Sequence, residues 1–168
     1  QMLKDEVALS KEKMKKIDLK LIVKSVVDDF NNIYEAKRGI KILLKKSNTQ
    51  EEYFINGIEN RIEQIIANLL DNSISFSNND KKILVEISKN EEEKIVLKVI
   101  DEGKGFKETN TKKIFDRFYS NRPDNFGEHS GLGLNIVKNL VELHDATISA
   151  SNNITQKGAN VEVTFPKA

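Results

Sequence analysis

Apolar residues recur at helical spacing in three parts of the chain. After Asp18, a residue type that favours the N-cap position, apolar side chains follow at three- and four-residue intervals as far as Gly39. A second stripe is formed by Ile62, Ile65, Ile66, Leu69 and Leu70. A third runs through "GLGLNIVKNLVELH" (131–144), in which we expect Ile136 to face inward. The pattern therefore predicts three amphipathic helices.

Short apolar runs with alternation predict strands between these helices. Residues 40–46 and 52–57 are short strand candidates around a polar turn, and "KILVEIS" and "KIVLKVI" form a hairpin pattern around "KNEEE". The chain closes with "ATISAS" and "NVEVTFP" around a loop that contains Gly158. Between these parts, "NTKKIFDRFY" is a short helix candidate.

The order of these elements predicts an α+β fold. Strands and helices are segregated rather than strictly alternating, which favours a mixed sheet with helices on one face. Residues 1–17 are rich in Lys and Glu and are interpreted as a linker or as the end of a preceding helix. Residues 18–168 are then expected to form one domain.

Composition excludes several classes of function. The content of 38% hydrophobic and 32% charged residues is typical of a soluble globular domain. With 27 basic against 26 acidic residues, no net charge favours nucleic acid as a partner. The absence of cysteine excludes thiolate chemistry, and two histidines are too few for a three-histidine metal site. No apolar run approaches the roughly 20 residues that a membrane span needs.

Two polar patterns suggest a site for a nucleotide and a metal ion. Asn68 and Asn72 are four residues apart, so they are neighbours on one side of the second helix. Their amide oxygens suit Mg²⁺, which takes one or two protein oxygens and keeps water and phosphates as its other ligands. In "DEGKGF" the carboxylate of Asp101 only accepts hydrogen bonds, so it suits the amino group of adenine. Gly103 and Gly105 would leave room for a flat ring.

A glycine-rich helix start supplies the third part of this site. Gly131 and Gly133 would let backbone N–H groups meet a phosphate where the helix dipole favours negative charge. Plainer interpretations are a solvated helix face, an ordinary turn after a strand and a closely packed helix start. Phe115 and Phe118 suit the core better than a ligand, and no catalytic role is expected for His129 or His144.

Four motifs in order resemble a known family. "NLLDNSISFS", "DEGKGF", "IFDRFY" and "GEHSGLGL" are similar to the N, G1, F and G2 boxes of the catalytic, ATP-binding domain of sensor histidine kinases. That domain belongs to a superfamily with gyrase B, Hsp90 and MutL, and the resemblance covers about residues 18 to 166. It implies a Bergerat-type α/β sandwich in which about three helices cover one face of a mixed sheet.

The resemblance also implies roles for particular residues. Asn72 with Asn68 would serve Mg²⁺ and catalysis, Asp101 would bind the adenine amino group, and residues 119–130 would form a lid. The implied nucleotide-binding set is Asn68, Asn72, Asp101, Gly103, Gly105, Phe106, Arg117, Phe118, Ser130, Gly131, Leu132, Gly133 and Leu134.

The implied reaction is transfer of the ATP γ-phosphoryl group to a histidine. Asn68 stands where gyrase-like ATPases carry a glutamate base, and a neutral imidazole needs no such base. The acceptor would lie on a dimerisation domain that is not in this chain. Many relatives have basic residues where this chain has Ser75 and Ser120. Arg117, Arg122 and Lys104 are the candidates to replace them.

The implied partners are ATP, the protein's own dimerisation domain and a response regulator, without nucleic acid. The full protein is expected to be a membrane-anchored homodimer with this domain in the cytoplasm, and the fragment a monomer. Two alternatives stay open: an ATP-driven conformational ATPase of the gyrase B or MutL kind, and a degenerate, non-catalytic scaffold.

Overall fold

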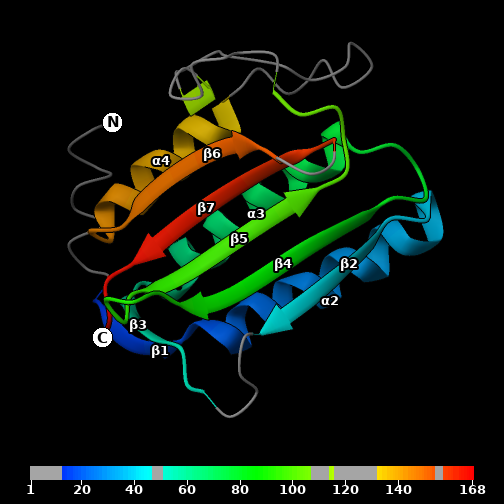
Figure 1. Ribbon diagram of the computed structural model, residues 1–168. Helices are drawn as coiled ribbons and strands as arrows, with labels where there is room; N and C mark the ends of the chain where they lie inside the picture. Colours follow the sequence, from blue (N-terminus) through cyan, green and yellow to red (C-terminus); the bar gives the residue numbers. More distant parts are fainter. Residues whose placement is uncertain (1–12, 47–50, 107–113, 116–131, 154–156) are drawn as a thin grey trace, which may run out of the picture.

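The structure is a computed structural model that describes residues 13–46, 51–106, 114–115, 132–153 and 157–168 (Figure 1). Among the helices in these ranges, none combines the length and the hydrophobicity that a membrane span requires. The elements in chain order are β1 (Lys15–Asp18), α2 (Leu19–Arg38), β2 (Lys41–Lys46), β3 (Phe54–Gly57), α3 (Glu59–Phe76), β4 (Lys82–Lys89), β5 (Ile95–Asp101), α4 (Leu132–Leu143), β6 (Thr147–Asn152) and β7 (Ala159–Phe165).

The strands form a five-stranded sheet in the order β2-β4-β5-β7-β6 and a separate pair, β1-β3. β2 runs parallel to β4, and the other neighbours are antiparallel, so the larger sheet is mixed. Figure 1 shows α2, α3 and α4 together behind this sheet. The predicted α+β class, with a mixed sheet covered on one face by three helices, is confirmed.

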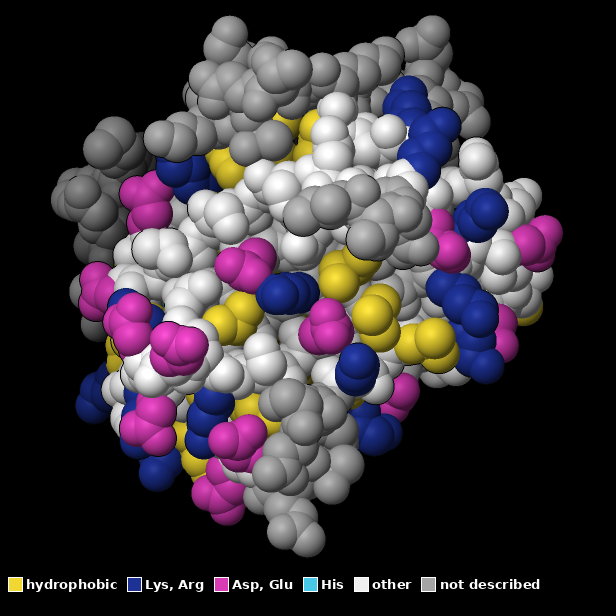
Figure 2. All heavy atoms as spheres, in the orientation of Figure 1, with side chains coloured by type: hydrophobic (Ala, Val, Ile, Leu, Met, Phe, Trp, Pro, Cys, Tyr) yellow, Lys and Arg dark blue, Asp and Glu magenta, His cyan; other side chains and the backbone are white. Residues whose placement is uncertain are grey.

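The uncovered face of the sheet carries alternating charges. Strand register places Lys45, Glu86, Lys98 and Glu162 in one row across β2, β4, β5 and β7. Lys45 lies 3.9 Å from Glu86, and Lys98 lies 3.6 Å from Glu162. Figure 2 shows basic, acidic and hydrophobic side chains interspersed on this face. Three of the four strand pairings in this sheet are antiparallel, and antiparallel strands commonly have one solvated face, so the core lies on the face that the helices cover.

Sequence signals set both ends of α2 as predicted. The Asp18 side chain accepts a hydrogen bond from the backbone N–H of Lys20 at 3.0 Å, and Gly39 ends the helix at φ +67°. The last helical residue, Arg38, also reaches the end of α3. Its guanidinium donates to the carbonyl oxygens of Ile74 at 3.0 Å and Ser77 at 2.6 Å. A cation from α2 therefore satisfies carbonyls at the C-terminus of α3.

One prediction about the start of the chain needs correction. Residues 15–17 were interpreted as linker or helix end, but Lys15–Asp18 forms β1, which pairs antiparallel with β3. The strand candidates at 40–46 and 52–57 are confirmed as β2 and β3. β2 joins the large sheet beside β4, and β3 pairs with β1. The interpretation of residues 1–12 lies outside the described residues.

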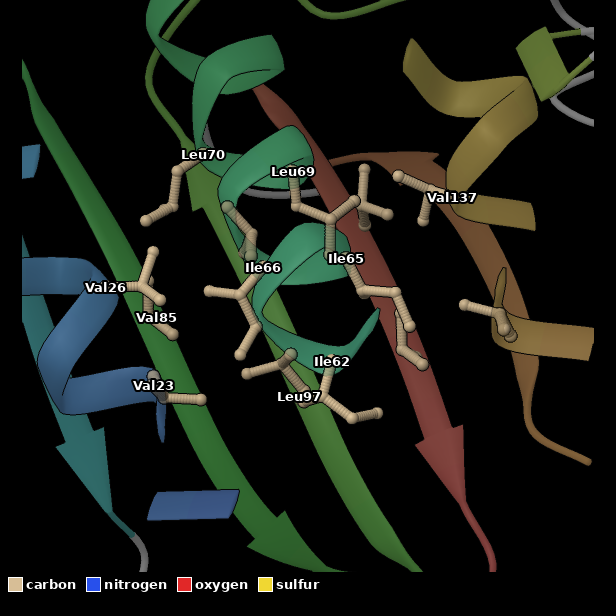
Figure 3. Packing of buried hydrophobic residues seen from close by; sticks show 14 of the residues in the cluster. Val23, Val26, Ile62, Ile65, Ile66, Leu69, Leu70, Val85, Leu97 and Val137 are labelled. Carbon is tan, nitrogen blue, oxygen red and sulfur yellow. The ribbon is translucent and has the colours of Figure 1, made fainter. Parts of the chain in front are cut away.

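The hydrophobic core is centred on α3, whose apolar stripe lies between the other two helices and the sheet. Figure 3 shows this stripe facing Val23 and Val26 of α2, Val85 and Leu97 of the sheet, and Val137 of α4. All five stripe residues are at most 1% exposed: Ile62, Ile65, Ile66, Leu69 and Leu70. The expected inward position of Ile136 was wrong, because its side chain is 38% exposed.

His144 joins the end of α4 to the start of α3. Its ring is buried, its Nε2 accepts from the backbone N–H of Ile58 at 3.1 Å, and its Nδ1 lies 2.8 Å from the carbonyl oxygen of Leu140. A neutral imidazole with the proton on Nδ1 satisfies both contacts. Both ring nitrogens are thus used by the fold.

Replacing His144 with phenylalanine is expected to lower the free energy of unfolding by about 1 to 3 kcal/mol. The ring volume is nearly kept, but the buried N–H of Ile58 loses its acceptor. Urea unfolding measures this cost, with the exposed Glu142→Gln as control. Equal midpoints for the two variants would show that the His144 contacts do not stabilise the fold.

Candidate functional site

Asp101 is the last residue of β5 and lies on the covered face of the sheet. The alternation of β5 buries Leu97, Val99 and Asp101 on that face, and Asp101 is opposite Ile83 of β4. The carboxylate is only 2% exposed. A strand that is otherwise apolar on this face therefore ends by placing an acid among buried side chains.

The two carboxylate oxygens of Asp101 differ in the hydrogen bonds that they accept. Oδ1 accepts from the backbone N–H of Gly103 at 2.9 Å and of Ala159 at 3.1 Å. Oδ2 accepts no hydrogen bond from any residue that the structure describes. Burial raises the pKa of Asp101 above its usual value, and the two N–H bonds oppose that shift. The site thus holds a desolvated acceptor that suits a ligand donor.

The glycines after Asp101 are required by the protein's own packing. A Cβ at Gly103 would lie 2.6 Å from the carbonyl oxygen of Phe76, at the end of α3. A Cβ at Gly105, where φ is +79°, would lie 2.6 Å from Oδ1 of Asn152. The sequence had suggested that these glycines leave room for a flat ring. Close contact with α3 and β6 is a sufficient reason for both.

The polar side of α3 is buried toward its C-terminus. Asn68 is half-buried, but Asn72 is 4% exposed and Ser75 is 3% exposed, so a solvated helix face is excluded there. The Ser75 hydroxyl donates to the carbonyl oxygen of Asn72 at 2.7 Å. Ser75 is therefore bonded within its own helix. The amide oxygens of Asn68 and Asn72 are hard, neutral metal ligands of the kind that Mg²⁺ binds.

Three segments far apart in the sequence have their ends on one side of the molecule. Figure 1 shows the C-terminal ends of β5 and α3 and the N-terminal end of α4 on the same side. Gly103 contacts Phe76, and Phe76 meets Phe106 edge-on with ring centroids 6.1 Å apart. The described contacts thus join the 101–106 segment to the end of α3, and the start of α4 lies on the same side.

The start of α4 is anchored to the short 3₁₀ turn at residues 114–115. The Asn135 side chain donates to the carbonyl oxygen of Phe115 at 3.2 Å, and Phe115 is buried, as expected of a core residue. Gly133 is half-buried, and Leu134 is 4% exposed within the hydrophobic core. The remaining predicted positions lie outside the described residues: Arg117, Phe118, Ser120, Arg122, His129, Ser130, Gly131, the lid at 119–130 and the side chain of Leu132.

A surface pocket of about 590 Å³ opens beside the 101–106 segment. Phe76 and Gly103 line it, together with three lysines, Lys81, Lys104 and Lys157. Asp101 is not among the lining residues, so this pocket adjoins the buried carboxylate but does not surround it. Lys104, one of the candidates for a phosphate contact, is exposed at this pocket.

Sequence reasoning missed the residues that hold Asp101 from the β6–β7 side. The Asn153 side chain donates to the backbone carbonyl of Asp101 at 3.1 Å, and the N–H of Ala159 binds the carboxylate. Consecutive asparagines at a strand end are typical of a turn, and an alanine N–H has no sequence signal. Only the pairing of β7 with β5 brings Ala159 near Asp101.

The chain is similar to a known protein family, to sensor proteins and to solved structures. The model of the family of histidine kinase-, DNA gyrase B-, and HSP90-like ATPases matches residues 57–168. Sensor protein ChvG of Agrobacterium fabrum is 32% identical over 162 residues, covering 90% of this chain and 27% of that protein. Sensor protein kinase PmrB of Pseudomonas aeruginosa is 33% identical over 132 residues, covering 79% of this chain and 28% of that protein.

The chain thus spans about a quarter of the length of these relatives. Among solved structures, the catalytic domain of histidine kinase ThkA has a TM-score of 0.78 at 23% identity, and the match covers 92% of this chain and 96% of that chain. The fold and the matched sequence lead to the same assignment. The chain belongs to the family of histidine kinase-, DNA gyrase B-, and HSP90-like ATPases.

Proposed function

We propose that this chain is the ATP-binding catalytic domain of a two-component sensor histidine kinase. The observation that carries the proposal is the carboxylate of Asp101, which is buried, with Oδ1 bonded twice and Oδ2 left without a donor among the described residues. The amino group of adenine supplies such a donor. Family membership and the sensor-kinase names of the matched relatives support ATP as the nucleotide.

The phosphates would lie between α3 and the start of α4. Asn72 and Asn68 would hold Mg²⁺ through their amide oxygens, and the N-terminus of α4 would favour the negative charge of the phosphates. When bound, Mg²⁺ neutralises charge on the transferring phosphoryl group. In this proposal the chain's own residues position the nucleotide and orient its γ-phosphate.

The reaction we propose needs no general base from this chain. A neutral imidazole nitrogen of the acceptor histidine attacks the γ-phosphorus, a P–N bond forms, the bond to the bridging oxygen breaks, and ADP leaves. The amide of Asn68 takes no proton, which suits this acceptor. His144 is unsuitable as the acceptor because it is buried and both of its ring nitrogens are engaged. His129 lies outside the described residues, and the resemblance to sensor histidine kinases places the acceptor on a separate dimerisation domain, as we propose here.

The proposed partners follow from the same assignment. ThkA has been solved in complex with the response regulator protein TrrA, and ShkA, another structural neighbour, in complex with AMPPNP. By analogy, we propose a cognate response regulator and a dimerisation domain as partners. The full protein would be a membrane-anchored homodimer with this domain in the cytoplasm, and the isolated chain a monomer.

One observation favours a second candidate, a non-catalytic scaffold. Ser75 stands where many relatives have a basic residue, and its hydroxyl is bonded to the Asn72 carbonyl. The position thus offers no cation to a phosphate. The conformational ATPase is disfavoured because Asn68 replaces the glutamate base.

Binding and transfer assays separate these functions. We expect saturable binding of AMPPNP by calorimetry, weakened when EDTA removes Mg²⁺. With ATP, we expect label to transfer to an added helical dimerisation domain, and none when its acceptor histidine is replaced by glutamine. Absence of binding would support the scaffold. Steady ATP hydrolysis without an acceptor domain would support the conformational ATPase.

A further inference from the structure

The 101–106 segment is held by an amide side chain that no nucleotide-binding motif includes. Asn152, the last residue of β6, forms two hydrogen bonds to the backbone of Phe106. Its Oδ1 accepts from the Phe106 N–H at 2.7 Å, and its Nδ2 donates to the Phe106 carbonyl at 3.2 Å. The carboxamide thus satisfies both backbone groups of one residue, as a paired strand would.

Asn152 and Gly105 are matched in shape. Gly105 has a φ of +79°, and a Cβ there would lie 2.6 Å from the Asn152 Oδ1. The amide therefore occupies the space that any larger residue at position 105 would need. The next residue, Asn153, donates from its side chain to the Asp101 carbonyl at 3.1 Å. Two consecutive asparagines thus hold the first and last residues of the 101–106 segment.

This arrangement connects Asn152 to the nucleotide site through packed side chains. Phe106 is 6% exposed and contacts Phe76 edge-on at the end of α3. The carbonyl oxygen of Phe76 is in turn the atom that limits Gly103. A movement of the Phe106 backbone would therefore displace Phe76 relative to Gly103 and change the distance between the end of α3 and Asp101.

We propose that Asn152 is a positioning residue for the nucleotide base, fixing the Gly105–Phe106 backbone so that the Asp101 carboxylate is held at the correct distance from α3. This inference rests on the proposed function, since it concerns the same site. It assigns to the end of β6 a role in the affinity for adenine and in its selection over other purines.

The test compares Asn152→Ala with Ser151→Ala, an exposed neighbour on the same strand. Asn152→Ala is expected to weaken AMPPNP binding about three- to tenfold, because the two hydrogen bonds that hold the Phe106 backbone are lost. Ser151→Ala should bind as the wild type does. Asn152→Asp serves as a second variant, since it keeps an acceptor for the Phe106 N–H but sets an oxygen against the Phe106 carbonyl. It should also bind less tightly than the wild type.

Two further measurements separate positioning from general stability. The preference for an adenine over a hypoxanthine nucleotide should fall in Asn152→Ala, because selection depends on where Asp101 is held. Amide hydrogen exchange should accelerate at Phe106 but not at Leu97 in the centre of β5. Unchanged affinity and base preference in a folded variant would overturn the inference, as would affinity loss with unchanged preference and unchanged exchange at Phe106. Failure of the wild type to bind any nucleotide would instead overturn the proposed function on which the inference rests.

Discussion

Asp101→Asn should bind ATP analogues about ten- to a hundredfold more weakly than the wild type, which corresponds to a charged hydrogen bond of roughly 1.5 to 3 kcal/mol. The two N–H groups of Gly103 and Ala159 fix the orientation of the new amide, because its oxygen must take the place of Oδ1. Its NH₂ group then stands at the Oδ2 position and meets the adenine amino group donor to donor. Calorimetric titration of Mg²⁺–AMPPNP measures the loss.

The same substitution should not lower the free energy of unfolding of the nucleotide-free protein. Burial raises the pKa of Asp101, with Glu102 adding to the rise, so the native state binds more protons than the unfolded state between the usual and the raised pKa. The free energy of unfolding of the wild type therefore falls as the pH rises through that window. Asp101→Asn lacks this fall, so its stability relative to the wild type should increase from acid to neutral pH.

Glu102→Gln is the matched control, because it makes the same change in charge one residue away. Glu102 is half-buried, and its Oε1 accepts from the Lys82 N–H at 2.8 Å, which an amide oxygen also does. We expect little change in nucleotide affinity from this control. An Asp101→Asn variant that binds AMPPNP as tightly as Glu102→Gln does would refute the role of Asp101 in binding the adenine base.

Gly158→Ala is expected to lower the free energy of unfolding by about 2 to 5 kcal/mol. Gly158 has a φ of +141°, which an L-residue rarely adopts, and a Cβ there would overlap the carbonyl oxygen of Asp101 and lie 2.7 Å from the Asn153 side chain. Two backbone segments meet at this point, so neither side yields by a simple rotamer change. Nucleotide affinity should fall as well, since the strain acts on Asp101 itself.

Thermal and urea unfolding of Gly158→Ala would be compared with Lys157→Ala. Lys157 is the preceding residue, and its side chain is exposed, so truncating it should have little effect on the midpoint. We expect Gly158→Ala to melt well below this control. Equal midpoints would show that the chain relaxes around position 158 and that the contact with Asp101 is not restrictive.

The sequence by itself determined the local elements and the family. Helical spacing and end signals placed α2 between Asp18 and Gly39, because a cap and a left-handed C-terminal residue act within one turn of the chain. Alternation and a polar turn placed the β4–β5 hairpin in the same way. Four ordered motifs identified the family that the matched relatives show. These features depend on residues that are close together in the chain, so they can be predicted from the sequence alone.

The tertiary structure decided everything that depends on residues far apart in the chain. Residues 15–18 are polar and short of apolar positions, and they are a strand only because β3 lies beside them. Arg38 stabilises the end of α3, and Ile136 is exposed, for reasons of packing that helical periodicity does not contain.

The site shows the same division. The sequence singled out Asp101, but only the folded chain brings Ala159 and Asn153 to it, satisfies Oδ1 and leaves Oδ2 without a donor among the described residues. The glycines at 103 and 105 were recognised by motif, yet their close contacts are with Phe76 and Asn152. The sequence sets which groups are available, and the pairing of β5 with β7 and β7 with β6 sets which atoms remain for a ligand.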